Sequence, residues 1–169
     1  TDTVYYGIDD YVNQFYRTTD GGDTWALRQD GLPNGSPNDI LVLPGNRRAL
    51  VGLDSGGLYR SDDMAESWEM AMDGMRECQV NDMTVSASDG SHAVAAIDGR
   101  RKYLAKTEDA GHTWHPLLTA PQELDSETPA EIGTVAFHPH DADTLYAADD
   151  FGWTEELRSY RSTDGGVTW

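Results

Sequence analysis

The sequence has a single cysteine, Cys78, only two lysines, and no apolar run that approaches 18 residues. One cysteine excludes an intrachain disulfide and a cysteine-rich zinc site. The lack of a long apolar run excludes a membrane-spanning helix from the 169 residues. The first ten residues, TDTVYYGIDD, have neither the basic region nor the apolar core of a signal peptide. We expect a soluble segment, and a signal upstream of Thr1 stays an open alternative.

Basic residues are also scarce, because 12 of them stand against 30 acidic residues, for a net charge of −18. This charge repels phosphate backbones and anionic membrane surfaces, so nucleic acid and membrane insertion are not expected. Two explanations of the acidity remain open: the cytoplasm of a halophile, and an extracytoplasmic surface. The length is typical of one domain, and 38% hydrophobic residues exclude a disordered chain.

What the sequence does contain is an eight-residue motif in four copies. Each copy has Ser or Thr first, Asp third, a small residue fifth, Thr or Ser seventh and Trp eighth. The copies are TTDGGDTW (18–25), SDDMAESW (61–68), TEDAGHTW (107–114) and STDGGVTW (162–169). Their tryptophans are 43, 46 and 55 residues apart, and such periods are typical of solenoids and propeller blades.

The segments around the motifs favour the propeller. Short runs rich in Val, Leu, Tyr and Thr, bounded by Gly, Asp, Asn and Pro, precede and follow the motifs, as in RALVGL, GLYRS, WEMAM and DILVLP. These are strand and turn patterns, and no window keeps a helical period, so we expect minimal helix. Four antiparallel strands per unit of about 45 residues predict an all-β fold, a β-propeller of four-stranded blades. With the strands lettered A to D from the axis outward, the motif falls on the C–D turn.

The pattern S/T-x-D-x-G-x-T-W on such a turn resembles the Asp-box, or BNR repeat, of sialidases, xyloglucan-degrading glycoside hydrolases, sortilin-type receptors and photosystem II assembly factors. The four copies cover the whole chain. The resemblance implies a propeller, and it implies no single activity, because these families place the repeat on unrelated functions.

Each residue type that recurs in the four motifs has a physical role. We expect the Asp to accept hydrogen bonds from amides one to three residues on, the Gly to adopt a positive φ, and the Trp to be buried between sheets. The expected structural residues are Asp20, Gly22, Trp25, Asp63, Trp68, Asp109, Gly111, Trp114, Asp164, Gly166 and Trp169. Ala65 replaces the glycine in the second copy, which predicts a strained or differently shaped turn. A calcium loop is the alternative, but the motif offers too few oxygen ligands for one.

The predicted strands number 14, or about three and a half blades, with units at roughly 1–37, 38–78, 79–131 and 132–169. One A strand and one D strand are missing, and an open ring leaves unpaired edges and an exposed sheet face. We therefore expect a segment of a larger propeller, whose remaining blades come from a longer chain or a partner chain.

In this strand order the B–C and D–A loops share the face opposite the motifs, and the resembling families usually bind substrate or partner there. The B–C loops are DDYVN, DSGG, DGRR and DDFGWTEE, and each begins with Asp. Aromatic rings beside carboxylates suit a sugar or a peptide. The candidate binding residues are Asp9, Tyr11, Asp54, Asp98, Arg100, Asp149, Asp150 and Trp153. The alternatives are that the acids form turns and that Trp153 fixes its own loop.

Two activities and one metal site are weighed by the geometry that each would need. Glycoside hydrolysis needs two carboxylates on one face, roughly 5 to 9.5 Å apart. A sialidase needs several convergent arginines, and only Arg100 and Arg101 lie on the right face, while the Arg-Ile-Pro signature of that family is absent. The run HPHDAD (138–143) has metal-ligand residue types, but it falls on an A–B turn and is interpreted as an ordinary turn.

We therefore predict a non-catalytic scaffold that binds protein or glycan through the B–C/D–A loops, without cofactor or metal. The alternative is a fragment of an Asp-box glycoside hydrolase, xyloglucanase-like more than sialidase-like.

Overall fold

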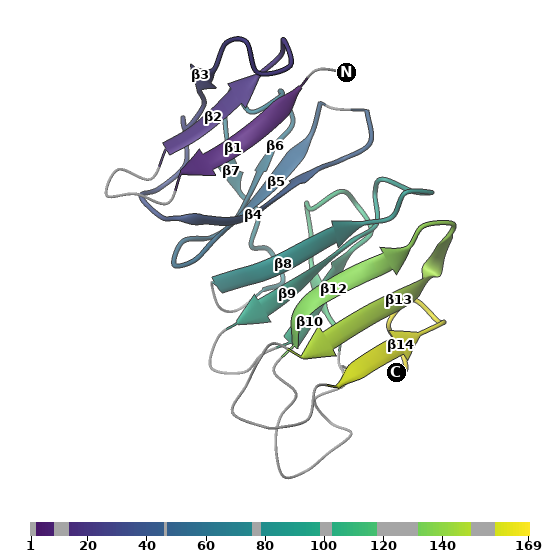
Figure 1. Ribbon diagram of the computed structural model, residues 1–169. Helices are drawn as coiled ribbons and strands as arrows, with labels where there is room; N and C mark the ends of the chain where they lie inside the picture. Colours follow the sequence, from purple (N-terminus) through teal and green to yellow (C-terminus); the bar gives the residue numbers. More distant parts are fainter. Residues whose placement is uncertain are drawn as a thin grey trace.

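The computed structural model describes residues 3–8, 14–45, 47–75, 79–98, 103–117, 132–149 and 158–169. Within these ranges the regular structure consists of fourteen β-strands and no helix. The strands form four antiparallel sheets that follow one another along the chain (Figure 1). The expected all-β propeller architecture is confirmed.

The first sheet contains β1 (Val4–Ile8), β2 (Gln14–Thr18) and β3 (Ala26–Leu27). The second contains β4 (Pro37–Val42), β5 (Ala49–Leu53), β6 (Gly57–Ser61) and β7 (Glu69–Met70). The third contains β8 (Gln79–Val85), β9 (Ala93–Asp98), β10 (Tyr103–Thr107) and β11 (His115–Pro116). The fourth contains β12 (Ile132–His138), β13 (Asp141–Asp149) and β14 (Ser159–Ser162). The strands of the two complete sheets are ordered A to D, with β4 and β8 as the A strands.

The core lies between successive sheets. Three buried clusters are centred on Trp68, Trp114 and Leu145, and each joins residues of two neighbouring sheets. β5 and residues 93–97 of β9 are buried on both faces. Because both faces are buried, these strands have no alternating polar residues, and several of their residues are Ala or Gly. Gly52 shows why small residues are needed, since a Cβ there would lie 2.6 Å from Val80 Cβ on the next sheet.

The four sheets make a partial propeller. The inner strands β4, β8 and β12 lie next to one another, whereas the first and last sheets lie at opposite ends of the molecule (Figure 1). The outer strands β3, β7 and β11 are only two residues long, which limits the exposed outer edge.

The eight-residue motifs form the same turn four times, after β2, β6, β10 and β14. In the first, Asp20 Oδ1 accepts from the Thr24 amide at 2.9 Å, and Asp20 Oδ2 accepts from the Thr24 hydroxyl at 2.6 Å. The Thr18 hydroxyl donates to Asp20 and accepts from the Gly22 amide at 3.0 Å. The other three motifs repeat these bonds. In all four the Asp reaches the amide four residues on, further than the one to three residues we expected.

The fourth and fifth motif positions both have positive φ in every copy. Gly21 and Gly22 adopt it in the first copy, but in the second copy Met64 and Ala65 each have a φ of 63°. The second turn therefore keeps the shape of the others and carries the strain of two non-glycine residues in the left-handed region. The sequence predicted that the turn at Ala65 would be either strained or differently shaped. The structure shows the strained backbone in a turn of the same shape as the others.

The expectation that all four motif tryptophans are core residues is wrong for Trp25. Trp68 and Trp114 are 3% and 0% exposed, and Trp169 is half-buried against the third cluster, but Trp25 is 43% exposed. Each buried tryptophan packs against the sheet that precedes its own; Trp68, for example, meets Phe15 edge-on at 5.0 Å. Trp25 belongs to the first sheet, so within the described residues no preceding sheet covers it.

Candidate functional site

The candidate site is the face formed by the B–C and D–A loops, called here the loop face. Its described parts are residues 54–56, between β5 and β6, and the segments 28–36 and 71–75, which lead out of β3 and β7. Asp98 and Asp149 end β9 and β13 on the same side. The opposite face carries the motif turns.

Asp54 ties two loops of this face together. Its Oδ1 accepts hydrogen bonds from the Ser36 amide at 3.2 Å and the Ser55 hydroxyl at 3.0 Å. Its amide donates to the Ser36 carbonyl at 2.9 Å. The Asp that begins this B–C loop therefore fixes the turn to the incoming D–A segment, which is how aspartate commonly stabilises turns.

The other predicted binding residues are only partly placed. Asp98 pairs with Gln79 and is half-buried, and the backbone of Asp149 pairs with that of Ile132. The remaining candidates lie outside the described residues; they are Asp9, Tyr11, Arg100, Asp150 and Trp153. Of the predicted acids, the structure therefore describes only Asp54, Asp98 and Asp149.

Two carboxylates that the sequence analysis missed lie on the inner strands of this face. Asp39 Oδ2 accepts from the Met83 amide at 2.6 Å, so β4 is bonded to β8. Asp82 Oδ2 accepts from the Val135 amide at 2.8 Å and the Thr134 hydroxyl at 2.6 Å, so β8 is bonded to β12. The sequence signal was the dipeptide Asn-Asp at the start of both strands.

Both residues follow a β-bulge. The register shifts between Pro37 and Asp39 and again between Val80 and Asp82. Bulges re-aim side chains, and here the two carboxylates point to the neighbouring inner strand. Burial raises the pKa of the Asp39 carboxyl, and the hydrogen bonds from Ile40 and Met83 only partly offset that effect. The nearby charge of Asp82 raises it further.

The run at 138–143 forms a turn between β12 and β13, as expected. Asp141 accepts from the Thr144 hydroxyl at 2.7 Å and from the Asp143 amide at 3.0 Å. The His138 and His140 rings lie edge-on, 6.2 Å apart. Among the described residues no group of three or more His, Cys, Asp or Glu side chains is arranged to hold a metal ion.

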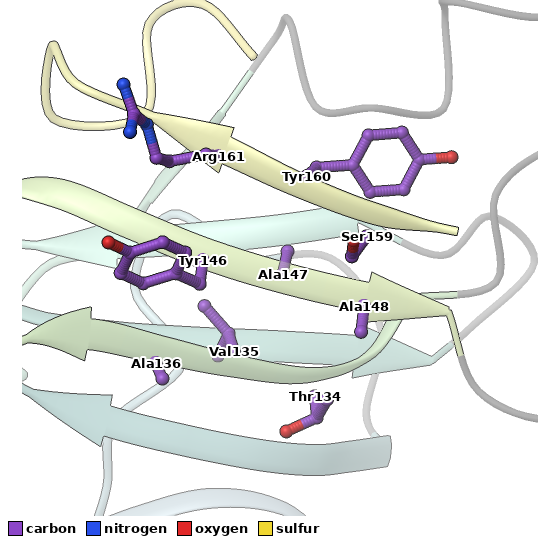
Figure 2. Close-up of a pocket in the computed structure, with 9 residues that line it drawn as sticks. All are labelled: Thr134, Val135, Ala136, Tyr146, Ala147, Ala148, Ser159, Tyr160 and Arg161. Carbon is purple, nitrogen blue, oxygen red and sulfur yellow. The ribbon is translucent and has the colours of Figure 1, made fainter. Parts of the chain in front are cut away.

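A separate groove of about 360 Å³ lies on the outward face of the last sheet. Figure 2 shows it lined by side chains of β12, β13 and β14, with Tyr146 and Arg161 near one end and Ala148 and Ser159 near the other. On the other three sheets the same face is covered by the following sheet.

The family is decided by a sequence match. The family model Sortilin-Vps10, described as sortilin, neurotensin receptor 3, matches residues 56–169. This chain belongs to the Sortilin-Vps10 family. The matched range includes three of the four motifs, and the family is of the BNR, or Asp-box, propeller type. No curated protein matches this Sortilin-Vps10 chain.

Solved structures agree on the fold. An ancestral GH74 enzyme is 21% identical with a TM-score of 0.79, and the alignment covers 100% of this chain and 22% of that chain. The GH74 xyloglucanase from Xanthomonas campestris is 20% identical with a TM-score of 0.75, covering 99% of this chain and 28% of that chain. The structure of YCF48 bound to D1 peptide is 21% identical with a TM-score of 0.55, and the alignment covers 98% of this chain and 63% of that chain. The Sortilin-Vps10 chain thus spans about a quarter of the length of the two GH74 structures.

These identities are low enough that the likeness carries the β-propeller fold alone. The described residues contain no helix long and apolar enough to cross a membrane.

Proposed function

We propose that this chain is a non-catalytic propeller scaffold that binds a protein or glycan ligand at the loop face. The observation that carries the proposal is the state of the loop-face carboxylates. Asp39, Asp54 and Asp82 each accept hydrogen bonds from the fold itself, two of them across the gap between sheets. A carboxylate that holds neighbouring backbone in place has a structural task, and the neighbouring B–C loops are left to contact a ligand.

The ligand-contacting residues in this proposal are those predicted from the sequence other than Asp54, whose carboxylate holds the Ser36 amide: Asp9, Tyr11, Asp98, Arg100, Asp149, Asp150 and Trp153. The peptide-bound YCF48 structure supports the proposal at the level of fold, since a propeller of this shape is seen there with a peptide. The side-chain bonds of the Asp-box turns on the opposite face stay within the fold among the described residues, so the proposed binding surface does not include these turns.

The second candidate is a glycoside hydrolase fragment of the Asp-box propeller type, xyloglucanase-like more than sialidase-like. It is favoured by one observation: burial raises the pKa of Asp39, and a second carboxylate, Asp82, is close enough to raise it further. A raised pKa beside a second carboxylate is one feature of a general acid.

The test measures binding and turnover on the same preparations. The chain is incubated with β-glucans and sialosides, and release of reducing sugar or sialic acid is measured together with binding to immobilised glycan and peptide libraries. The scaffold proposal expects saturable binding without turnover. Trp153→Ala and Asp98→Ala are expected to weaken binding at least about tenfold, the range of a contact worth about 1.4 kcal/mol.

The matched control is Asp62→Ala, which removes an acid from the motif face and should leave binding unchanged. Turnover that disappears in Asp39→Asn, Asp98→Ala or Asp149→Ala would establish the hydrolase alternative and reject the scaffold. Binding that responds to Asp62→Ala and not to the loop-face variants would reject the loop face as the site.

A further inference from the structure

A small cavity of about 200 Å³, called here the junction cavity, lies where the second sheet meets the motif turn of the third. It is lined by residues of the two four-stranded sheets and of that turn, namely Arg60, Glu69, Met70, Ala71, Gly111 and His112. The cavity is separate from the loop face, because Arg60 directly precedes the motif at 61–68. The function proposed above uses none of these side chains.

The equivalent place between the first and second sheets holds three charged side chains. Arg17 pairs with Glu66 at 2.8 Å, and Arg28 pairs with the same carboxylate oxygen at 3.3 Å. Arg17 also donates to the Met64 carbonyl of the next motif. The Glu66 carboxylate at this junction therefore lies between two guanidinium groups of the preceding sheet.

The junction cavity keeps the first of these arginines and loses the other two side chains. The strand registers and the motif positions give the equivalents, which are Arg60 for Arg17, Ala71 for Arg28 and His112 for Glu66. The Arg28 and Ala71 amides donate to equivalent carbonyls, those of Phe15 and Leu58, at 2.8 Å in each case. The cavity thus lies where the first junction has a carboxylate and an arginine side chain.

The junction of the third and fourth sheets has an apolar side chain at the same place. Leu117 is the equivalent of Ala71, since its amide donates to the Leu104 carbonyl at 2.9 Å. A Cβ on Gly166 of the fourth motif would lie 2.7 Å from Leu117 Cδ1. Of these three junctions, the one at the cavity therefore has neither the ion pairs of the first nor the leucine of the third.

The charged groups of the junction cavity have few partners. The Arg60 side chain is 10% exposed and pairs with Asp62 of its own turn at 2.8 Å. Among the described residues Arg60 donates no hydrogen bond to the third motif, and its buried Nε–H has no acceptor. Glu69 is exposed beside Arg60 on the neighbouring strand, and it has no ion pair with a described residue.

We propose that the junction cavity binds a small zwitterion of the α-amino acid class, with its carboxylate at Arg60 and His112 and its ammonium group at Glu69. The ligand carboxylate takes the place that the Glu66 carboxylate has at the first junction. Arginine and imidazole N–H groups are donors that suit a carboxylate, and a carboxylate such as that of Glu69 accepts from an ammonium group.

Charge and size decide this class of ligand. Asp62 already neutralises Arg60, and Glu69 adds a negative charge, so a simple anion is repelled. A simple cation would leave the donors of Arg60 and His112 without an acceptor. The volume of about 200 Å³ is below the roughly 300 Å³ of the smallest pockets for drug-sized ligands, so the ligand is the size of one amino acid.

The test is a titration of the 169-residue chain at about pH 7, where carboxylate and ammonium groups are both charged. The amide chemical shifts of Ala71 and Gly111 are followed by NMR with three probes: L-alanine, propionate, which lacks the ammonium group, and ethylamine, which lacks the carboxylate. We expect saturable shifts with L-alanine at a Kd on the order of 1 mM, and at least about tenfold weaker binding of each singly charged probe.

Two substitutions separate the roles of the charges. Arg60→Gln should weaken the binding of L-alanine at least about tenfold, because the ligand carboxylate loses its cation. Glu69→Gln should weaken L-alanine but strengthen propionate, since it removes both the partner of the ammonium group and the repulsion of a bare carboxylate. A role of Glu69 in shaping the cavity alone would change both probes in the same direction, which would contradict the proposal.

His112→Glu rebuilds the acid of the first junction. Its carboxylate should pair with Arg60 and abolish the binding of L-alanine, while thermal unfolding of the variant stays cooperative. Arg47→Gln is the matched control for the loss of an arginine, because Arg47 is exposed on the turn between β4 and β5, and it should leave binding unchanged.

Three results would overturn the proposal. The first is no saturable shift with L-alanine up to about 100 mM, which would put any Kd above that range. The second is equal affinity for the three probes. The third is a folded Arg60→Gln or His112→Glu variant that binds L-alanine as the parent does.

Discussion

At the scale of single residues, the motif turn depends on two left-handed positions and one carboxylate. Glycine adopts the left-handed region without steric cost, whereas other L-residues lose about 1 to 2 kcal/mol there. Met64 and Ala65 occupy it because Asp63 and Ser61 make the same bonds as in the glycine-containing copies. The hydrogen bonds of the turn thus override the backbone preference of its two central residues.

Met64→Gly should raise the free energy of unfolding by about 1 kcal/mol, since it removes the strain of a side chain at a φ of 63°. Chemical denaturation followed by tryptophan fluorescence measures the change. Gly21→Ala, at the same position of the first motif, is the mirror control and should cost about 1 to 2 kcal/mol. A Met64→Gly variant that is less stable than the parent would show that the Met64 side chain stabilises the fold by more than its left-handed backbone costs.

Asp109 makes stability depend on pH. Burial acts to raise the pKa of its carboxyl, but the bonds from Thr113, Thr107 and His112 outweigh burial and lower the pKa to about 2. Because the folded pKa lies below the unfolded value of about 3.9, the stabilisation is complete above that value and is lost as pH falls toward 2. The pKa of Asp164 is likewise lowered to about 2, by the Thr168 hydroxyl and amide and by Ser162.

Asp109→Asn should therefore be less stable than the parent at neutral pH, and the difference should shrink between about pH 4 and 2. Urea unfolding at several pH values measures it. Parallel curves for the two proteins over that range would contradict the assignment.

At the scale of elements, the inner strands are joined by side chains as well as by packing. Asp39 and Asp82 each reach an amide of the next inner strand after a bulge has turned them toward it. The third inner strand, β12, has Thr134 at the equivalent register position. Successive sheets are therefore linked near the axis by a repeated side-chain hydrogen bond. Near the outer strands they are also linked by backbone bonds, from the Trp68 amide to the Asp30 carbonyl at 2.9 Å and from the Trp114 amide to the Asp73 carbonyl at 2.8 Å.

Asp82→Ala should lower the free energy of unfolding by about 1 to 3 kcal/mol, because it leaves the buried Val135 amide without its acceptor. Asp82→Asn, which keeps an oxygen acceptor, should recover part of the loss. Glu69→Ala, on the exposed strand β7, is the control for removal of one acid and should have little effect. Equal losses in the alanine and asparagine variants would mean that charge, and not the hydrogen bond, links the strands.

At the scale of the whole molecule, the formal charge of −18 acts against the compact state through self-repulsion. Salt screens such repulsion over about 10 Å at 0.1 M. The halophile and extracytoplasmic interpretations both stay predictions, and the response to salt is what separates them.

The melting temperature should rise as salt is raised toward molar concentrations if the acidic surface is an adaptation to high salt. Differential scanning calorimetry at increasing potassium chloride measures it. A melting temperature that stays level or falls with salt would count against that adaptation and favour the extracytoplasmic surface.

The architecture follows from the sequence alone, because the motif spacing of 43 to 55 residues and the runs between motifs are local signals that repeat in register. The sequence also shows where the turns lie, since Asp, Gly and Thr act within eight residues. It could not find Asp39 and Asp82, whose partners are more than 40 residues away. Nor could it show which motif tryptophans are buried, because Trp25 and its buried equivalents end the same eight-residue motif. Both depend on which sheet packs against which, and that packing joins residues far apart in the sequence, so local patterns do not reveal it.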